Sequence, residues 1–205
     1  VLSIHGGPEW MYGGYFLPEF HVLPTFGYAV LAANPTGSAG YGQAFTDAIN
    51  GDWGGAPYED LMKGLDDVLR RHTWIDPDRV AAAGASFGGY MINWIQGQTD
   101  RFKAAINISG KVNIISFLGD SPRITTRNYD AAEVGQDRIG ATLWEPPHKY
   151  IATSAVMFAD RIETPLLMLS GEGDWNVPAT NQREMYYALR RLGKEVVWVH
   201  YTAGG

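Results

Sequence analysis

Short, continuous apolar runs alternate with longer segments of helical periodicity along most of this chain. A strand with one face in solvent alternates apolar and polar residues, whereas a strand buried in a parallel sheet is apolar at nearly every position. The alternation of such strands with helices predicts a mostly parallel sheet with helices on both faces, the α/β class. The strands that we expect are 1–4, 28–33, 79–84, 104–108, 165–170 and 196–201.

Two helices are predicted clearly. The segment 58–71 places its apolar residues on one face, and its acidic start and basic end suit the helix dipole. A second helix opens at Pro178 and runs to about Leu192, because Gly193 is typical of a helix stop. Its inward residues are expected to be Met185, Leu189 and Leu192. The stretch 113–141, rich in Gly, Asp and Arg, is expected to be an irregular excursion over the strand ends, where insertions often shape substrate pockets.

The chain is long and apolar enough for one domain, 1–205, with 45% hydrophobic residues. It begins within a predicted strand, so we expect a domain truncated at both ends. A net charge of -6 without blocks of one sign argues against a nucleic-acid partner. No apolar run approaches the roughly 18 residues that span a bilayer, which argues against a membrane partner. The absence of Cys excludes disulfides and leaves the compartment open, with the cytoplasm slightly favoured over the periplasm.

The segment Gly84-Ala85-Ser86-Phe87-Gly88 follows the predicted strand 79–84 and precedes a helical stretch. The G-x-S-x-G pattern in this strand–turn–helix setting is typical of a nucleophile elbow, a sharp turn that exposes a catalytic serine. Glycine is needed on both sides because a Cβ beside the strained turn would clash with its neighbours. A tight turn without a catalytic role is the alternative. We predict that Ser86 is the nucleophile.

A glycine loop, His5-Gly6-Gly7-Pro8, directly follows the first predicted strand. Acyl transfer develops charge on the substrate's carbonyl oxygen, and two backbone N–H groups can stabilise it: one after the nucleophile and one from a loop in this position. We predict that Phe87 and Gly7 are these oxyanion donors; an ordinary Gly-Pro turn is the alternative. His5 precedes the serine in chain order, so we expect it to orient the loop and not to act as the base.

An acid is expected on the loop that follows the strand 165–170, where it would hold a histidine base in the correct tautomer. We predict Asp174 for this role; Glu172 is the alternative, in which case Asp174 merely caps the next helix. The base should lie after the last strand, and His200 is the one histidine beyond Asp174. His200 falls within the predicted strand 196–201, so we expect its ring to face the covering of the sheet. The base then lies beyond Gly205. The remaining histidines have no second ligand at metal spacing, so neither a metal site nor a cofactor is expected.

Several short sequence motifs, taken together, resemble those of the prolyl oligopeptidase family of serine peptidases, which includes dipeptidyl and acylaminoacyl peptidases. The resemblance covers almost the whole chain. The matching motifs are His5-Gly6-Gly7-Pro8, Gly27-Tyr28-Ala29-Val30, Asn34-Pro35-Thr36-Gly37-Ser38 with Gly40-Tyr41-Gly42, Trp53-Gly54-Gly55, Asp76-Pro77-Asp78-Arg79, Ser86-Phe87-Gly88-Gly89-Tyr90 and Gly173-Asp174-Trp175-Asn176-Val177-Pro178. Thr36 stands where the family usually has Arg, so the way in which family members anchor that loop does not carry over to this chain.

The resemblance implies an α/β-hydrolase domain and roles for two further residues. Asn176 would bind the carbonyl of the residue that precedes the scissile one, and Val177 would border the pocket for the scissile residue. The family usually closes with Gly-x-Gly-His, so Ala203-Gly204-Gly205 would stop one residue short of the base. Members also carry an N-terminal β-propeller, which these residues do not include.

The function that these residues predict is peptide hydrolysis through an acyl-enzyme on Ser86, with residues 1–205 alone nearly inactive for want of the histidine. Peptides are the expected partner, and an exposed sheet edge would favour a homo-oligomer. A carboxylesterase on the same fold is the second hypothesis, since the elbow and oxyanion loop serve esters and amides alike. A non-catalytic, hydrolase-like binding module is the third.

Overall fold

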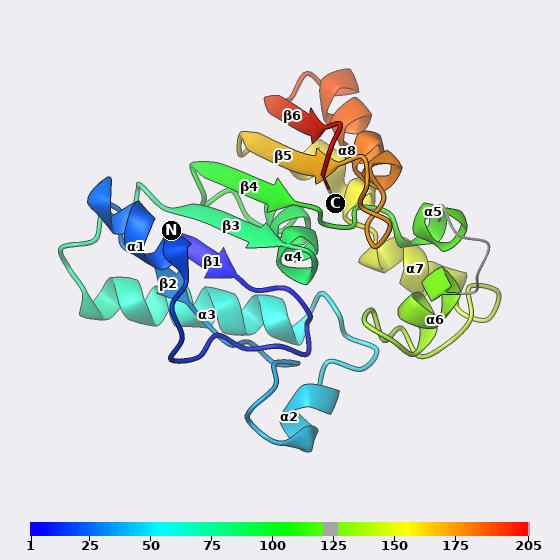
Figure 1. Cartoon of the computed structure of the whole chain (residues 1–205), viewed down its shortest axis with the longest axis horizontal. Helices are drawn as coiled ribbons and strands as arrows, with labels where there is room; N and C mark the ends of the chain where they lie inside the picture. The colour runs from blue at the N-terminus through cyan, green and yellow to red at the C-terminus, as the bar shows by residue number, and fades with distance from the viewer. Residues whose placement is uncertain (121–126, 205) are drawn as a thin grey trace.

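Six parallel strands form one sheet in the computed structural model, which describes residues 1–120 and 127–204 (Figure 1). The strands are β1 Leu2–Ile4, β2 Leu31–Ala32, β3 Ala81–Ala85, β4 Ala104–Ile108, β5 Leu166–Gly171 and β6 Val196–Tyr201. Their order is β2-β1-β3-β4-β5-β6, and every neighbouring pair is parallel. The predicted α/β class is confirmed. Because all strands run the same way, the loops after β1, β3 and β5 emerge at one edge of the sheet.

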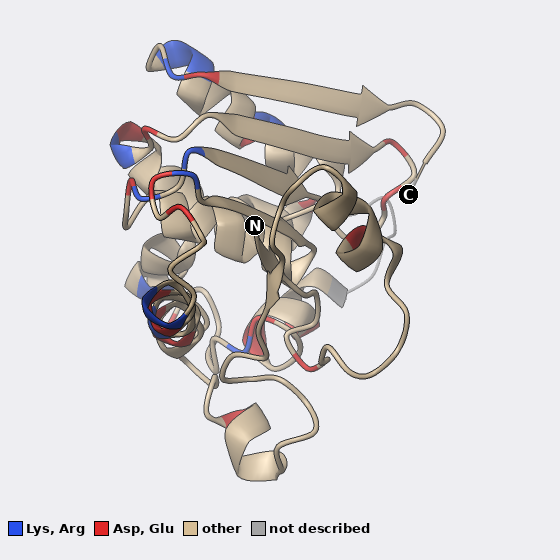
Figure 2. Ribbon diagram, turned by 90° about the vertical axis from the view of Figure 1, so that its left-hand side faces the viewer, with Lys and Arg blue, Asp and Glu red and all other residues tan. Residues whose placement is uncertain are grey.

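The helices connect these strands. They are α1 Pro18–Thr25, α2 Gln43–Asp47, α3 Ala56–Arg71, α4 Phe87–Gln96, α5 Ile114–Gly119, α6 Arg127–Glu133, α7 Pro147–Thr153 and α8 Ala179–Arg191, with a 3₁₀ helix over Ala155–Arg161. None of the helices within the described residues is long and apolar enough to cross a membrane. Figure 2 shows that the strands carry no Lys, Arg, Asp or Glu, and that these residues lie on helices and loops.

Three sequence-based boundaries need correction. The strand expected over 28–33 is confined to β2, because β1 offers ladder partners only through Leu2 and Ser3. Pro178 is not helical: it is the N-cap of α8, with ψ of 138°. In α8, Met185 and Leu189 are fully buried as predicted, but Leu192 is 44% exposed, because the helix ends one residue before it.

The excursion expected to be irregular over 113–141 contains two helices, α5 and α6, so that prediction was wrong; its residues 121–126 lie outside the described part of the chain. The side chain of Asn113 accepts hydrogen bonds from the N–H groups of Ile115 and Ser116. This is the cap that asparagine commonly supplies at a helix start. The capping residue was therefore the available signal for α5.

The helix α4 anchors the centre of the molecule. All of its residues except Trp94 are buried, and it packs against β1, β3 and β4. In β4, β5 and β6 burial alternates along each strand, with Val196 8% exposed and Val197 57%, so the burial expected at nearly every position of these strands was wrong. The turn between β3 and α4 is therefore held between the two most central strands and a fully packed helix.

Candidate active site

The turn between β3 and α4 places Ser86 in a strained conformation, with φ of 56° and ψ of -117°. Such dihedrals are rare outside glycine and persist where surrounding contacts impose them. The Ser86 N–H donates to the carbonyl of Ile108 at 2.9 Å, which ties the turn to the end of β4. A Cβ at Gly84 would lie 2.5 Å from the carbonyl carbon of Gly88, and a Cβ at Gly88 would overlap the carbonyl of Ile4. Both positions therefore need glycine, because any side chain there would clash with neighbouring backbone atoms.

The glycine loop after β1 lies directly against this serine. A Cβ at Gly6 would be 3.3 Å from the Cβ of Ser86 and 3.9 Å from its Oγ. Gly7 has φ of 122°, where a side chain would meet the backbone of Glu9 at 2.7 Å. Gly7, Phe87 and Ser86 line one pocket. The structure thus brings the predicted nucleophile and both predicted oxyanion donors together.

His5 is buried beneath this loop. Its Nδ1–H donates to the carbonyl of Gly6 at 2.7 Å, and its Nε2 lies 2.9 Å from the hydroxyl of Ser38. The rings of Trp10 and Tyr12 pack edge-on against it. Burial lowers the pKa of His5, and the bond to Gly6 opposes this shift without outweighing it. These contacts suit the loop-orienting role that chain order predicts for His5.

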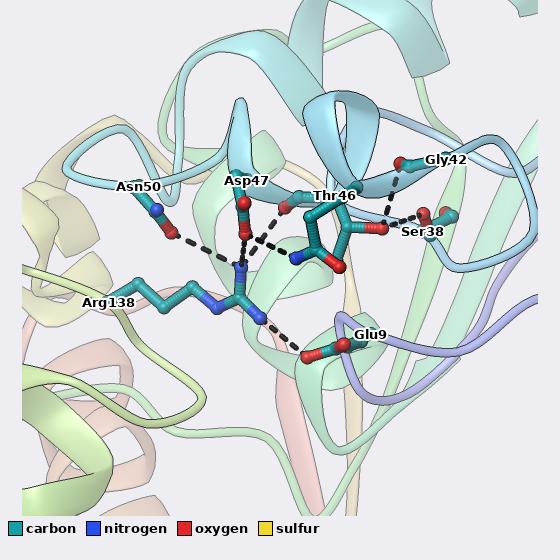
Figure 3. Close-up of polar contacts among 8 residues, drawn as sticks. Glu9, Ser38, Gly42, Thr46, Asp47, Asn50 and Arg138 are labelled. Atoms are coloured by element: carbon teal, nitrogen blue, oxygen red, sulfur yellow. Dashed lines mark hydrogen bonds and ion pairs between the residues drawn. The ribbon is translucent and has the colours of Figure 1, made fainter.

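A second support of the glycine loop is Arg138, which the sequence analysis missed (Figure 3). Its guanidinium donates to the carboxylate of Glu9 at 2.5 Å. It also donates to the carbonyl of Thr46 at 3.1 Å and to the side chains of Asn50 and Asp47 at 3.2 and 3.4 Å. The Arg138 side chain is only 14% exposed. Arg138 therefore ties three chain segments together: the end of the glycine loop, the α2 region and the segment after α6.

Asp174 follows β5, on the loop before α8. Its Oδ1 accepts hydrogen bonds from the N–H groups of Asn176 and Val177, at 2.9 and 2.8 Å. Since α8 begins at Ala179, these bonds close a turn ahead of the helix and do not cap it. The alternative acid, Glu172, has a side chain 69% exposed. The geometry thus holds the Asp174 carboxylate in one orientation and leaves Glu172 at the surface.

His200 lies on β6 with both ring nitrogens engaged. Nδ1 is 3.1 Å from the hydroxyl of Ser170, and Nε2 is 2.5 Å from the carboxylate of Glu172. Within residues 1–120 and 127–204, no histidine forms a hydrogen bond with Ser86 or Asp174. The chain after β6 nevertheless returns to the acid loop, because the N–H of Gly173 donates to the carbonyl of Gly204 at 2.7 Å.

The pocket at Ser86 combines expected and unexpected residues. Its lining comprises Gly7, Trp53, Ser86, Phe87, Lys111, Gln136, Asp137 and Val177. Val177 is the predicted substrate-pocket residue; Asp174 and Asn176 are not part of this lining. Lys111 and Asp137 form an ion pair there, which sequence reasoning missed because the two residues lie on different segments. In the described part of the chain, no group of three or more His, Cys, Asp or Glu could hold a metal ion.

A parallel sheet that carries a strained serine between a central strand and a buried helix defines the α/β-hydrolase class. The glycine loop after the neighbouring strand and the acidic loop after β5 complete its arrangement. Families within this class share the fold and are told apart by their sequences.

The chain belongs to the prolyl oligopeptidase family, whose sequence model matches residues 15–205. It is 42% identical over 202 residues to the uncharacterized peptidase YuxL of Bacillus subtilis, covering 98% of this chain and 30% of that protein. It is 48% identical over 196 residues to dipeptidyl-peptidase 5 of Arthroderma otae, covering 93% of this chain and 26% of that protein. The structure of Pyrococcus horikoshii acylaminoacyl peptidase superimposes with a TM-score of 0.88 at 30% identity, covering 99% of this chain and 32% of that one. The predicted family is confirmed, and the chain spans about a third or less of these relatives.

Proposed function

We propose that the natural protein containing this chain is a serine peptidase that hydrolyses short peptides through an acyl-enzyme on Ser86. The observation that carries the proposal is one pocket lined by Ser86, Gly7, Phe87 and Val177. A nucleophile, two backbone donors and a side-chain wall are the elements that acyl transfer requires. The names of the relatives, peptidases that act on dipeptidyl or acylaminoacyl groups, favour a peptide over other acyl substrates.

The reaction starts when Ser86 Oγ attacks the peptide carbonyl. The proton of Ser86 passes to a histidine, and the carbonyl oxygen takes up negative charge that the N–H groups of Gly7 and Phe87 stabilise. The histidine then protonates the leaving amine, and the acyl-enzyme forms. Water attacks that ester with the same histidine as base, which releases the acid and restores Ser86. Asp174 orients the imidazole and stabilises its protonated form.

The histidine is assigned to the loop that β6 leads into. None of the described histidines forms a hydrogen bond with Ser86 or Asp174, and the bond from Gly173 to Gly204 holds the chain after β6 one residue from Asp174. A histidine on this loop would reach the Asp174 carboxylate, whose orientation the turn to Val177 fixes.

Two residues of the acid loop are assigned to the substrate. Val177, only 3% exposed, forms part of the wall for the scissile residue's side chain. Asn176 donates its backbone N–H to Asp174, two residues earlier on the same loop. Its amide side chain is assigned to the carbonyl of the preceding substrate residue.

The test compares a peptidyl 4-nitroanilide with the matching 4-nitrophenyl ester, using the natural protein and its Ser86→Ala variant. Thr153→Ala is the control, because it removes a hydroxyl on α7 that bonds within its own helix. Loss of anilide hydrolysis in Ser86→Ala alone supports the peptidase. Ester cleavage without anilide cleavage would instead indicate a carboxylesterase. No Ser86-dependent turnover of either substrate would indicate a non-catalytic module.

A further inference from the structure

A second cavity adjoins the pocket at Ser86. The glycine loop lines it through Gly7, Pro8 and Glu9, and the chain after α6 lines it through Gln136 and Arg138. Gly7 and Gln136 also line the pocket that holds Ser86, so the two spaces meet at these residues. The second cavity has a volume of about 360 Å³, which is enough for an amino-acid side chain. A group of the substrate that lies next to the reacting carbonyl can therefore enter it.

Glu9 presents an acidic group to this cavity. Its Oε2 accepts a hydrogen bond from the Arg138 guanidinium at 2.5 Å (Figure 3). Within residues 1–120 and 127–204, the Glu9 carboxylate accepts no other hydrogen bond. The side chain of Glu9 is 56% exposed and that of Arg138 only 14%. One carboxylate oxygen is thus held by a mostly buried guanidinium, and the other can accept a hydrogen bond from a guest.

The group of charges around Arg138 is negative in sum. Its guanidinium lies between the carboxylates of Glu9 and Asp47, at 2.5 and 3.4 Å. The further partner of Asp47 is the neutral amide of Gln43, at 2.9 Å. One positive charge therefore faces two negative charges. A cation beside Glu9 is attracted by this excess of negative charge, whereas a carboxylate is repelled by it.

The position of Glu9 is prepared before a substrate binds, because Arg138 is fixed at both ends. The carbonyl of Arg138 accepts a hydrogen bond from the N–H of Gly51 at 2.7 Å. Its guanidinium donates to the carbonyl of Thr46 at 3.1 Å and to the side chain of Asn50 at 3.2 Å. A carboxylate held in this way loses less conformational freedom on binding than an unrestrained one.

The order of the strands separates the two halves of a bound peptide. β3, which leads into Ser86, has β1 on one side and β4 followed by β5 on the other. The proposed function assigns the acyl half of the peptide to the loop after β5, through Asn176 and Val177. An extended peptide with its carbonyl at Ser86 then directs its leaving half to the opposite side. Glu9 lies on that side, on the loop after β1.

We propose that this cavity binds the first residue of the leaving group, and that Glu9 selects a basic side chain, Lys or Arg, at that position. The proposal rests on the proposed peptidase function and adds the class of peptide that the site prefers. Glu9 acts as a specificity-determining residue: it contacts the substrate side chain and takes no part in proton transfer.

The experiment varies the leaving group on one acyl half. The peptidyl 4-nitroanilide that the natural protein cleaves supplies this acyl half, and the anilide is replaced by a dipeptide amide that begins with Lys, norleucine or Glu and ends with Gly. Norleucine has an unbranched apolar side chain like the stem of lysine and carries no charge. Chromatography of the released amine gives kcat/KM for each substrate. All three substrates form the same acyl-enzyme, so their kcat/KM values differ only through binding and acylation.

The wild-type protein is expected to prefer Lys over norleucine by about 5-fold and Lys over Glu by about 20-fold, as for an ion pair between partly exposed groups. Glu9→Gln keeps an oxygen for the hydrogen bond from Arg138 and removes the charge, so the Lys-to-norleucine ratio should fall to about 1. Glu9→Lys should place the Glu substrate above the Lys substrate. Each ratio is formed within one variant, so a change in overall activity cancels.

Glu163→Gln is the matched control. Glu163 is likewise an exposed carboxylate on a mostly buried cation: its side chain is 67% exposed, and that of its partner Lys194 is 19% exposed. It precedes β5 and therefore lies at the opposite end of that strand from the acid loop. This variant should keep the wild-type preference for Lys. Labelling of Ser86 by a small fluorophosphonate reports whether each variant retains a working nucleophile.

The proposal is overturned if the wild-type protein cleaves the Lys and norleucine substrates equally well. It is also overturned if Glu9→Gln keeps the preference for Lys, or if Glu163→Gln loses it. In each of these cases the cleavage itself still supports the serine peptidase. If the natural protein cleaves neither the anilide nor any of the three peptides in a Ser86-dependent way, the proposed function fails and this proposal fails with it.

Discussion

Replacing Gly88 by alanine tests whether the elbow depends on close backbone contact. A Cβ at Gly88 would lie about 1 Å inside the 3.0 Å limit that real Cβ atoms respect, and the atom it meets is the backbone carbonyl oxygen of Ile4. The carbonyl of His5 lies 2.9 Å away on the same side. No side-chain rotation relieves these contacts, so β1 must move away from α4.

The displacement sets the size of the effect. Overpacking of this kind costs about 1–3 kcal/mol of unfolding free energy, and backbone contacts place Gly88→Ala toward the upper end. Because β1 leads directly into the glycine loop, its shift also moves Gly7 relative to Ser86. A misplacement of about 1 Å in a catalytic arrangement reduces turnover by about 100-fold.

Gly64→Ala is the matched control. Gly64 lies within α3, and a Cβ there would have no neighbour within 4 Å. This substitution is expected to stabilise the protein by about 0.5–1 kcal/mol, because glycine is unfavourable inside a helix. Urea unfolding and kcat/KM of the natural protein measure both effects. Equal effects of the two substitutions, or a Gly88→Ala variant with unchanged kcat/KM, would refute the reasoning.

Three further results are expected. Burial lowers the pKa of His5 below its ordinary value of 6.5, so the unfolded chain binds a proton at this histidine more readily than the folded chain does. The contribution of His5 to the free energy of unfolding is therefore complete above pH 6.5 and declines as the pH falls toward the lowered pKa. Urea unfolding across pH should show this decline in the wild type and not in His5→Gln. Arg138→Met should cost about 1–3 kcal/mol of unfolding free energy and lower kcat, with little recovery in Arg138→Lys, since an ammonium cannot reproduce the guanidinium's spread of donors. Unchanged kcat would contradict its support of the glycine loop. The polypeptide 1–205 alone should hydrolyse peptidyl anilides about 10⁶-fold more slowly than a serine peptidase with its full triad, and rapid Ser86-dependent turnover would contradict the assignment of the base.

Local features of the site were predictable from sequence because their constraints are local. The glycines around Ser86 follow from a tight turn between a strand and a helix, and the loop at Gly7 follows from its place after a neighbouring parallel strand. The loop of Asp174 could be placed by the same logic. For these three residues the sequence predicts position, and their catalytic roles remain predictions.

Features that depend on distant partners were missed. Lys111 meets Asp137 across 26 residues, and Arg138 meets Glu9 across 129, with no periodicity to connect them. The length of β2 was overestimated because a strand's extent depends on its neighbour, here the short β1. The helix α5 was missed although Asn113 supplies a recognisable cap.

The most direct test of the account is mass-spectrometric mapping of the natural protein after reaction with a fluorophosphonate. The account predicts a single adduct on Ser86, absent from Ser86→Ala and retained in Thr153→Ala. An adduct on another residue, or no adduct on a folded protein, would contradict the assignment of Ser86 as the nucleophile.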